Sequence, residues 1–172
     1  NLPIINKTQE DCMINELSRL TQPAANRLIA SKQTISVSES STGGLISAAL
    51  LSIPGASAYY KGGSVVYTLS SRKIFLGLTK EDIEGLEPMT ESMALRFAEK
   101  TRSRLNSDWA IAELGIAGPT GSPYGVGAGT SVIAIAGPTS NTVKIETGDN
   151  DRESNMMAFT KSALELLKTT IS

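Results

Sequence analysis

The sequence contains no histidine and only one cysteine, Cys12. The missing histidine excludes a Ser-His-Asp or Cys-His catalytic group built from this chain alone. A single cysteine forms no internal disulfide, and without histidine it does not supply the ligands of a tetrahedral zinc site. Any nucleophilic chemistry must therefore depend on lysine, arginine, tyrosine, a carboxylate or water to move protons.

The sequence also lacks an excess of either charge and any long apolar run. The sequence contains 16 Lys and Arg residues and 17 Asp and Glu residues, so it has no excess of positive charge. Because nucleic-acid binding requires a basic surface, we expect no nucleic-acid partner. A membrane-spanning helix needs about 20 apolar residues, whereas the longest apolar stretch, residues 45–53, is interrupted by serines. These absences, with no secretory signal visible, predict a globular protein of the cytoplasm without membrane contact.

Hydrophobic periodicity predicts helices that alternate with strands. Helices are expected over residues 9–30, 41–52, 70–76, 90–105 and 151–170, with Pro23 kinking or splitting the first. Strands are expected over residues 34–38, 62–68, 109–114, 130–136 and 142–146, the last two as a hairpin. Residues 1–8 are expected to form a tail before a single domain, residues 9–172. This order predicts an α/β fold, a three-layer α/β/α sandwich with a mixed sheet.

The turn Glu39-Ser-Ser-Thr-Gly-Gly44 lies between a predicted strand and a predicted helix. Backbone N–H groups and the positive end of a helix favour an anion at such a turn, and its two glycines let an oxyanion approach. The alternative is a helix cap, supplied by Ser41 or Thr42, within a tight packing turn. No Gly-Lys-Ser/Thr follows at the spacing of a Walker A loop, so that motif is excluded.

A second candidate is residues 115–129, which contain six glycines and two prolines. Loops of this length without secondary structure usually carry function, and the alternative is a mobile hairpin tip. The segment Gly125-Val-Gly-Ala-Gly129 does not have the G-x-G-x-x-G spacing, and a strand rather than a helix follows it. A dinucleotide-binding motif is therefore rejected.

Two further segments carry reactive or charged side chains. In residues 54–63, Ser57 is either a helix cap or a nucleophile, and the nearby tyrosines either stack on a flat ring or simply pack. In residues 148–153, the acidic side chains suit either an oxygen-ligand metal site or a helix N-terminus, and the helix start is favoured. Arg152 could hold a phosphate or carboxylate with two hydrogen bonds.

Six segments together resemble the CinA C-terminal family, which includes bacterial nicotinamide-nucleotide amidases. They occur in family order between about residue 10 and residue 170, at residues 38–45, 53–60, 62–67, 76–78, 115–121 and 148–152. The resemblance implies a sheet of five strands and hydrolysis of nicotinamide mononucleotide to nicotinate mononucleotide plus ammonia. It implies a small phosphorylated nucleotide as the partner and no metal or redox cofactor.

The resemblance also implies roles for particular residues. Ser57 matches the family's nucleophilic serine, and Arg72 stands where relatives have a catalytic lysine, with Lys73 next to it. Because a guanidinium stays protonated and is a poor base, Lys73 or Lys61 would take the proton. The residues expected to bind the substrate, by backbone N–H groups, hydroxyls, rings or charge, are Glu39, Ser40, Thr42, Gly43, Gly44, Tyr59, Tyr67, Gly115, Ala117, Gly118, Thr120, Gly121 and Arg152.

Three departures from the family pattern keep a second hypothesis open. They are Arg72, then Leu114 in place of a small hydroxyl residue, and Met156 in place of a second arginine. The chain is therefore either an amidohydrolase or a related domain that binds a nucleotide as a sensor or partner module. A purely structural interaction domain would leave the glycine-rich loops unexplained. Small α/β enzymes often form symmetric oligomers, so a homodimer is expected.

Overall fold

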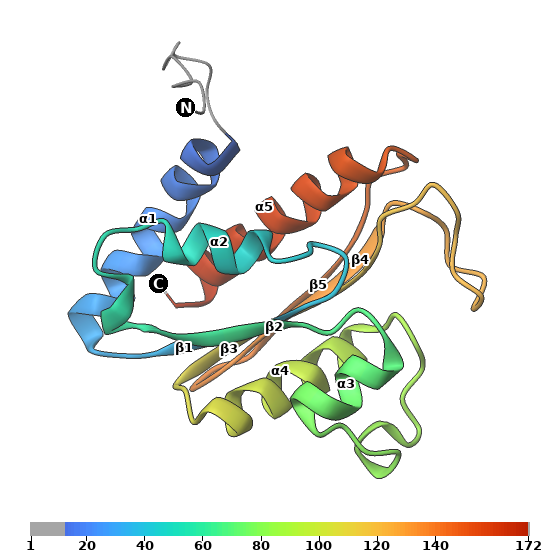
Figure 1. The fold of residues 1–172 in the computed structure, drawn as a ribbon, viewed down its shortest axis with the longest axis horizontal. Coiled ribbons are helices and arrows are strands. Elements are labelled where there is room, and N and C mark those ends of the chain that lie inside the picture. Colours follow the sequence, from blue (N-terminus) through green and yellow to red (C-terminus); the bar gives the residue numbers. More distant parts are fainter. Residues whose placement is uncertain (1–12, 172) are drawn as a thin grey trace, which may run out of the picture.

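The computed structural model describes residues 13–171 (Figure 1). The predicted tail, residues 1–8, and the predicted start of the first helix, residues 9–12, lie outside the described residues. The helices are α1 Met13–Ser31, α2 Leu45–Leu51, α3 Leu69–Leu76, α4 Glu91–Leu105 and α5 Arg152–Thr170, with short 3₁₀ turns η1 Ala56–Ala58 and η2 Glu81–Ile83. The strands are β1 Ile35–Glu39, β2 Tyr60–Val65, β3 Trp109–Ile116, β4 Thr130–Ala136 and β5 Asn141–Glu146.

The five strands form one mixed sheet in the order β2-β1-β3-β4-β5. Strand β1 is parallel to both β2 and β3, whereas β3, β4 and β5 are antiparallel to one another in turn. Helices α1, α2 and α5 cover one face of the sheet, and α3 and α4 cover the other (Figure 1). The predicted three-layer sandwich is confirmed.

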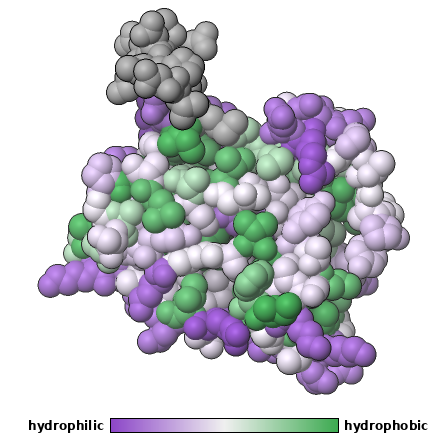
Figure 2. All heavy atoms as spheres, viewed as in Figure 1, coloured by the Kyte–Doolittle hydropathy of each residue, from purple (hydrophilic) through white to green (hydrophobic). Residues whose placement is uncertain are grey.

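Each face of the sheet has its own apolar cluster. On β3, Ile111 belongs to the cluster with α1, α2 and α5, whereas Ala112 and Leu114 belong to the cluster with α4. This alternation follows from the period of two residues along a strand. On the outer side of the second layer, α3 exposes three large apolar side chains, Leu69, Ile74 and Phe75. Figure 2 shows hydrophobic side chains at the surface of the region that α3 occupies in Figure 1.

The helix predicted from residue 41 begins at Leu45 instead. Gly43 and Gly44 adopt positive φ angles of 63° and 103°, a region that does not continue a right-handed helix. The chain therefore makes a turn after β1 before α2 starts. Strand β2 likewise ends at Val65, because Thr68 accepts a hydrogen bond from the Ser71 amide and begins α3.

Pro23 lies inside α1, which continues through it, so the predicted splitting of this helix is wrong. A proline removes one helical hydrogen bond, but the residues around it are anchored in the core. Ala24, Ala25 and Leu28 are at most 2% exposed. Between residues 13 and 171, none of the helices combines the length and the apolar character needed to cross a bilayer.

The parallel strands place three chain segments at one edge of the sheet. Because β1, β2 and β3 run in the same direction, their carboxyl ends meet there. The turn at residues 40–44, the segment at residues 66–68 and the loop that follows β3 all leave from this edge. In open α/β sheets, the crevice outside the carboxyl ends of the strands is the usual place for a ligand.

Candidate functional site

A cavity of about 650 Å³ opens at this edge of the sheet. Its walls come from the turn after β1, the segment from Tyr67 to Met89, the inner face of α4, the end of β3 with the following loop, and Arg152. Segments far apart in the sequence thus enclose one space. Ligand sites for small molecules commonly have volumes of about 300–1,000 Å³.

The structure brings many of the predicted site residues together around this cavity. Those that line it are Ser40, Tyr67, Arg72, Lys73, Gly115, Ala117, Gly118, Thr120, Gly121 and Arg152. The sequence reasoning missed several others, including the apolar side chains Leu78, Met93 and Phe97 and the cationic Lys80. The apolar spacing of Met93 and Phe97 indicated only a packed face of α4, with no signal for a ligand.

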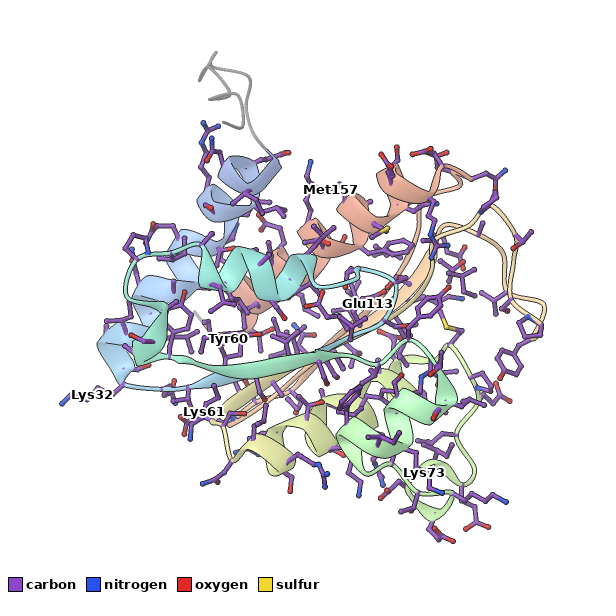
Figure 3. All side chains as sticks on the ribbon, in the orientation of Figure 1. Lys32, Tyr60, Lys61, Lys73, Glu113 and Met157 are labelled. Carbon is purple, nitrogen blue, oxygen red and sulfur yellow. The ribbon has the colours of Figure 1, made fainter. Side chains whose placement is uncertain are left out.

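Ser57 does not line the cavity, so the structure gives no support to its predicted role within one chain. It lies exposed in η1, just before β2. The carbonyl of the nearby Tyr59 accepts a hydrogen bond from the amide of Ile35, the first residue of β1. Ser57 is therefore at the amino end of the parallel strands, whereas the cavity is at their carboxyl end. Lys61 shares this location, far from Glu113 at the other end of the sheet (Figure 3).

Tyr59 belongs to the core and not to the site. Its side chain is 1% exposed, and its hydroxyl donates a hydrogen bond to the Leu50 carbonyl. Burial raises the pKa of Tyr59 to about 12. The predicted stacking of this ring on a ligand is wrong, because the sequence did not show which way the side chain points.

The turn after β1 is occupied by the protein's own carboxylates. Glu39 accepts hydrogen bonds from the amides of Gly44, Ile46 and Ser47, and from the hydroxyls of Thr42 and Ser47. This carboxylate therefore caps α2, which supports the cap alternative, although the capping oxygen comes from Glu39 rather than from Ser41 or Thr42. Glu39, Thr42, Gly43 and Gly44 do not line the cavity.

A second carboxylate, Glu113, completes this turn and was missed by the sequence reasoning. Its Oε2 accepts the Ser40 amide at 2.9 Å and the Thr42 amide at 3.2 Å, while its Oε1 accepts the Ser41 hydroxyl at 2.6 Å. The Thr42 hydroxyl lies 2.7 Å from Glu39 and 3.1 Å from Glu113, so both carboxylates share it. One feature of the sequence could have indicated a role for Glu113: it is the one acidic residue inside the otherwise apolar stretch of residues 109–114.

Glu113 is fully buried, between α2 and the sheet (Figure 3). Burial raises the pKa of its carboxyl group, and the hydrogen bonds from Ser41, Ser40 and Thr42 act in the opposite direction. The folded protein therefore holds a proton on Glu113 at pH values where the unfolded chain has released it.

This raised pKa predicts a particular dependence of stability on pH. Above the ordinary glutamate pKa of about 4.3, the folded state binds more protons than the unfolded state, so stability falls as pH rises toward the folded pKa. We expect the wild type to lose stability relative to Glu113→Gln as the pH rises, by up to about 1.4 kcal/mol per pH unit. Urea unfolding of both proteins between about pH 5 and about pH 8 measures the difference. A constant difference across this range would contradict the prediction.

The charged side chains that line the cavity are all cationic. They are Arg72, Lys73, Lys80 and Arg152, and no Asp or Glu is among the lining residues that the structure describes. Arg72 lies 5.4 Å from the centre of the Phe97 ring and donates from Nε to the Val66 carbonyl. Burial lowers the pKa of Arg72, but an arginine keeps its charge in proteins. The cavity is therefore electrostatically suited to an anion.

Arg152 joins three parts of the site. Its guanidinium donates to the Gly118 carbonyl at 2.7 Å and to the Tyr67 hydroxyl at 3.3 Å. Asp151 caps α5 by accepting the Ser154 amide at 2.8 Å, which supports the helix-start alternative for the acidic residues here. Asn155 donates to the Ala117 carbonyl and so holds the loop after β3 against α5.

Known proteins with similar sequences and structures share one family description. A family model described as the CinA C-terminal domain matches residues 17–171. A CinA-like protein from Gloeobacter violaceus is 34% identical over 94% of this chain and 38% of its own length, and one from Thermosynechococcus vestitus is 32% identical over 92% of this chain and 39% of its own. The chain thus spans less than two fifths of these relatives.

Solved structures match along nearly their whole length. A CinA superfamily protein from Enterobacter cloacae has a TM-score of 0.83 at 29% identity, covering 91% of this chain and 92% of that one. The competence/damage inducible protein CihA from Agrobacterium tumefaciens has a TM-score of 0.81 at 28% identity, covering 90% and 94%.

Proposed function

The chain belongs to the CinA C-terminal domain family, and we propose that it binds nicotinamide mononucleotide in its cavity and hydrolyses the carboxamide to nicotinate mononucleotide and ammonia. One observation carries the proposal: among residues 13–171, four cationic side chains and no carboxylate line a cavity that also has apolar and aromatic walls. This combination suits a ligand with a phosphate at one end and a flat ring at the other.

The cations have two separate locations on the cavity wall. Arg72, Lys73 and Lys80 come from α3 and the segment after it, whereas Arg152 stands at the start of α5 beside Gly118. Arginine binds a phosphate with two parallel hydrogen bonds, and lysine binds it as a point charge. Either location would hold the phosphate, and the other would face the carboxamide end.

Aromatic side chains provide a place for the pyridine ring. Tyr67, Phe97 and Tyr124 line the cavity, and Leu78 and Met93 add apolar surface between them. A flat ring gains from contact with aromatic faces, and the hydroxyls of Tyr67 and Tyr124 keep contact with water. Because Tyr67 also accepts a hydrogen bond from Arg152, a ring and a phosphate would be held by connected groups.

The proposal predicts ammonia release and a charge-dependent affinity. Purified protein should bind nicotinamide mononucleotide in calorimetry and release ammonia from it. Lys73→Ala should weaken binding by about fivefold to tenfold, because one cation in a partly dry cavity contributes roughly 1 kcal/mol. Lys61→Ala is the matched control, since this exposed lysine lies at the other end of the sheet (Figure 3). No binding by the wild type, or equal loss in both variants, would contradict the proposal.

A second candidate function is binding without hydrolysis. It is favoured by the position of Ser57 outside the cavity and by Arg72 at the place of the family's lysine. In that case nicotinamide mononucleotide raises the melting temperature while no ammonia forms, even at high protein concentration. A melting-temperature measurement together with an ammonia assay therefore separates an enzyme from a sensor or partner module.

A further inference from the structure

Helix α3 carries an apolar surface that remains largely exposed among residues 13–171. Leu69 is 71% exposed, Ile74 is 63% exposed and Phe75 is 54% exposed, whereas Leu76 packs into the core. A surface helix usually keeps its apolar side chains on the face toward the core and polar ones on the opposite face. Exposed apolar patches mark places where another molecule binds. We call Leu69, Ile74 and Phe75, with the groove beside them, the α3 surface.

The groove has a volume of about 210 Å³ and lies at the edge of the sheet. Phe75 of α3 and Leu105 of α4 give it apolar walls, and the edge strand β2 lines it through Gly62 and its neighbours. A Cβ atom at Gly62 would lie 3.6 Å from Cδ1 of Leu105, so the missing side chain keeps the groove open. The α3 surface therefore combines an exposed apolar side chain, Ile74, with a hollow large enough to accept one.

The charged residues next to the α3 surface are separated by sign. Residues 69–80 contain three cations and no acidic residue, and residues 81–89 contain four acidic residues and no cation. Arg72 is half-buried, and Asp82 pairs with Lys100 at 2.8 Å. The others are exposed and form no ion pair within the described part of the chain: Lys73, Lys80, Glu81, Glu84 and Glu87. The α3 surface thus has a positive part and a negative part beside its apolar centre.

We propose that the α3 surface binds the α3 surface of a second copy of this chain across a twofold axis. A twofold contact brings together the same patch from both copies, so the patch must complement itself. Rotation about an axis through the apolar centre places the positive part of one copy against the negative part of the other. Ile74 of each copy would face the groove of its partner, and the charges would form the polar rim that is typical of protein interfaces.

The two signs of charge favour a second copy over a membrane surface. An apolar helix face that binds anionic lipid is bordered by lysine and arginine, whereas the segment that follows α3 carries Glu81, Glu84 and Glu87. Figure 2 shows hydrophilic residues beside the hydrophobic ones in this region of the molecule. The glutamates would repel an anionic surface, but they complement the lysines of an identical chain. Lys73 and Lys80 also line the cavity, so each cavity would open next to the partner copy.

Sedimentation velocity over a range of protein concentrations tests the proposal without any ligand. The wild type should form dimers, and Ile74→Glu should raise the dissociation constant at least about tenfold, because it places a charge in the apolar centre. Leu51→Glu is the matched control, since Leu51 is 54% exposed on α2 in the opposite layer. The control should keep the dissociation constant within about twofold of the wild type. A wild type that is monomeric at about 100 μM, or an equal loss in both variants, would overturn the proposal.

Charge reversal tests the twofold arrangement itself. The variant Lys73→Glu/Lys80→Glu makes the positive part of the surface negative. The variant Glu84→Lys/Glu87→Lys makes the negative part predominantly positive. Each variant alone should dimerise at least about tenfold more weakly than the wild type, because like charges then meet at the rim. An equimolar mixture of the two should associate about as tightly as the wild type, because opposite charges meet again.

Two results of these experiments would contradict the inference. If the mixture stays monomeric while the wild type forms dimers, another surface makes the dimer. If the wild type is monomeric and sediments with vesicles that contain phosphatidylserine, the α3 surface binds lipid instead. These measurements use no nicotinamide mononucleotide, so their outcome is independent of what the cavity binds.

Discussion

Replacing Glu39 with alanine is expected to lower the free energy of unfolding by about 3–5 kcal/mol. The Glu39 carboxylate is fully buried and accepts five hydrogen bonds from the turn after β1 and the first turn of α2. Alanine would leave three buried or half-buried amides, those of Gly44, Ile46 and Ser47, without their acceptor. Each unsatisfied buried donor costs about 1–3 kcal/mol, and the start of α2 would lose its cap.

Urea denaturation followed by circular dichroism measures this effect. The matched control is Glu153→Ala, because Glu153 is an exposed acidic residue in the first turn of α5. The control should change stability by less than about 0.5 kcal/mol. If Glu39→Ala cost no more than the control, the turn would draw its stability from contacts other than this carboxylate.

Replacing Gly115 with alanine is expected to cost about 3 kcal/mol of stability and to reduce ammonia release. A Cβ atom here would collide with the Ser41 Oγ, with Glu113 Oε1 and with Cδ2 of Phe159. Overpacking of this kind typically costs about 1–3 kcal/mol, and here the neighbours have little freedom to move. Phe159 is fully buried, and two amides and three hydroxyls lie within hydrogen-bond distance of the Glu113 carboxylate.

Gly127→Ala is the control for Gly115→Ala. A Cβ atom at Gly127 meets no heavy atom within 4 Å, so this variant should stay within about 0.5 kcal/mol of the wild type. Chemical denaturation gives the stability of both variants, and the ammonia assay gives their activity. Equal stability of the two alanine variants would show that the Ser41–Glu113 pair shifts without cost.

The layers of the fold could be predicted from the sequence because each element has a clear period. The apolar spacing of α4, the apolar run of β4 and the alternation in β5 are local properties, and all three elements formed where expected. The ends of β2 and α2 were less predictable. Hydrogen bonds accepted by Thr68 from the Ser71 amide and by Glu39 from the Gly44 amide decide those ends, and neither bond has a signature in apolar spacing.

The candidate site was only partly predictable, for a physical reason that Ser57 illustrates. A motif shows which residues are near one another along the chain, but not at which end of a strand they lie. Ser57 and Ser40 stand at opposite ends of the same parallel strands, and only the topology separates them. Glu113 was missed because its partners at residues 40–42 are about 70 positions away in sequence. The homodimer stays a prediction.

The hydroxyl of Thr42 has a single hydrogen but lies within hydrogen-bond distance of two buried carboxylates. When that hydrogen goes to Glu39, Glu113 faces an oxygen lone pair unless it carries a hydrogen of its own, and burial raises the pKa of Glu113. Assembly of this turn therefore draws a hydrogen ion out of the surrounding solution. The heat of folding should in consequence vary with the ionisation enthalpy of the buffer, as it does for any reaction that consumes acid.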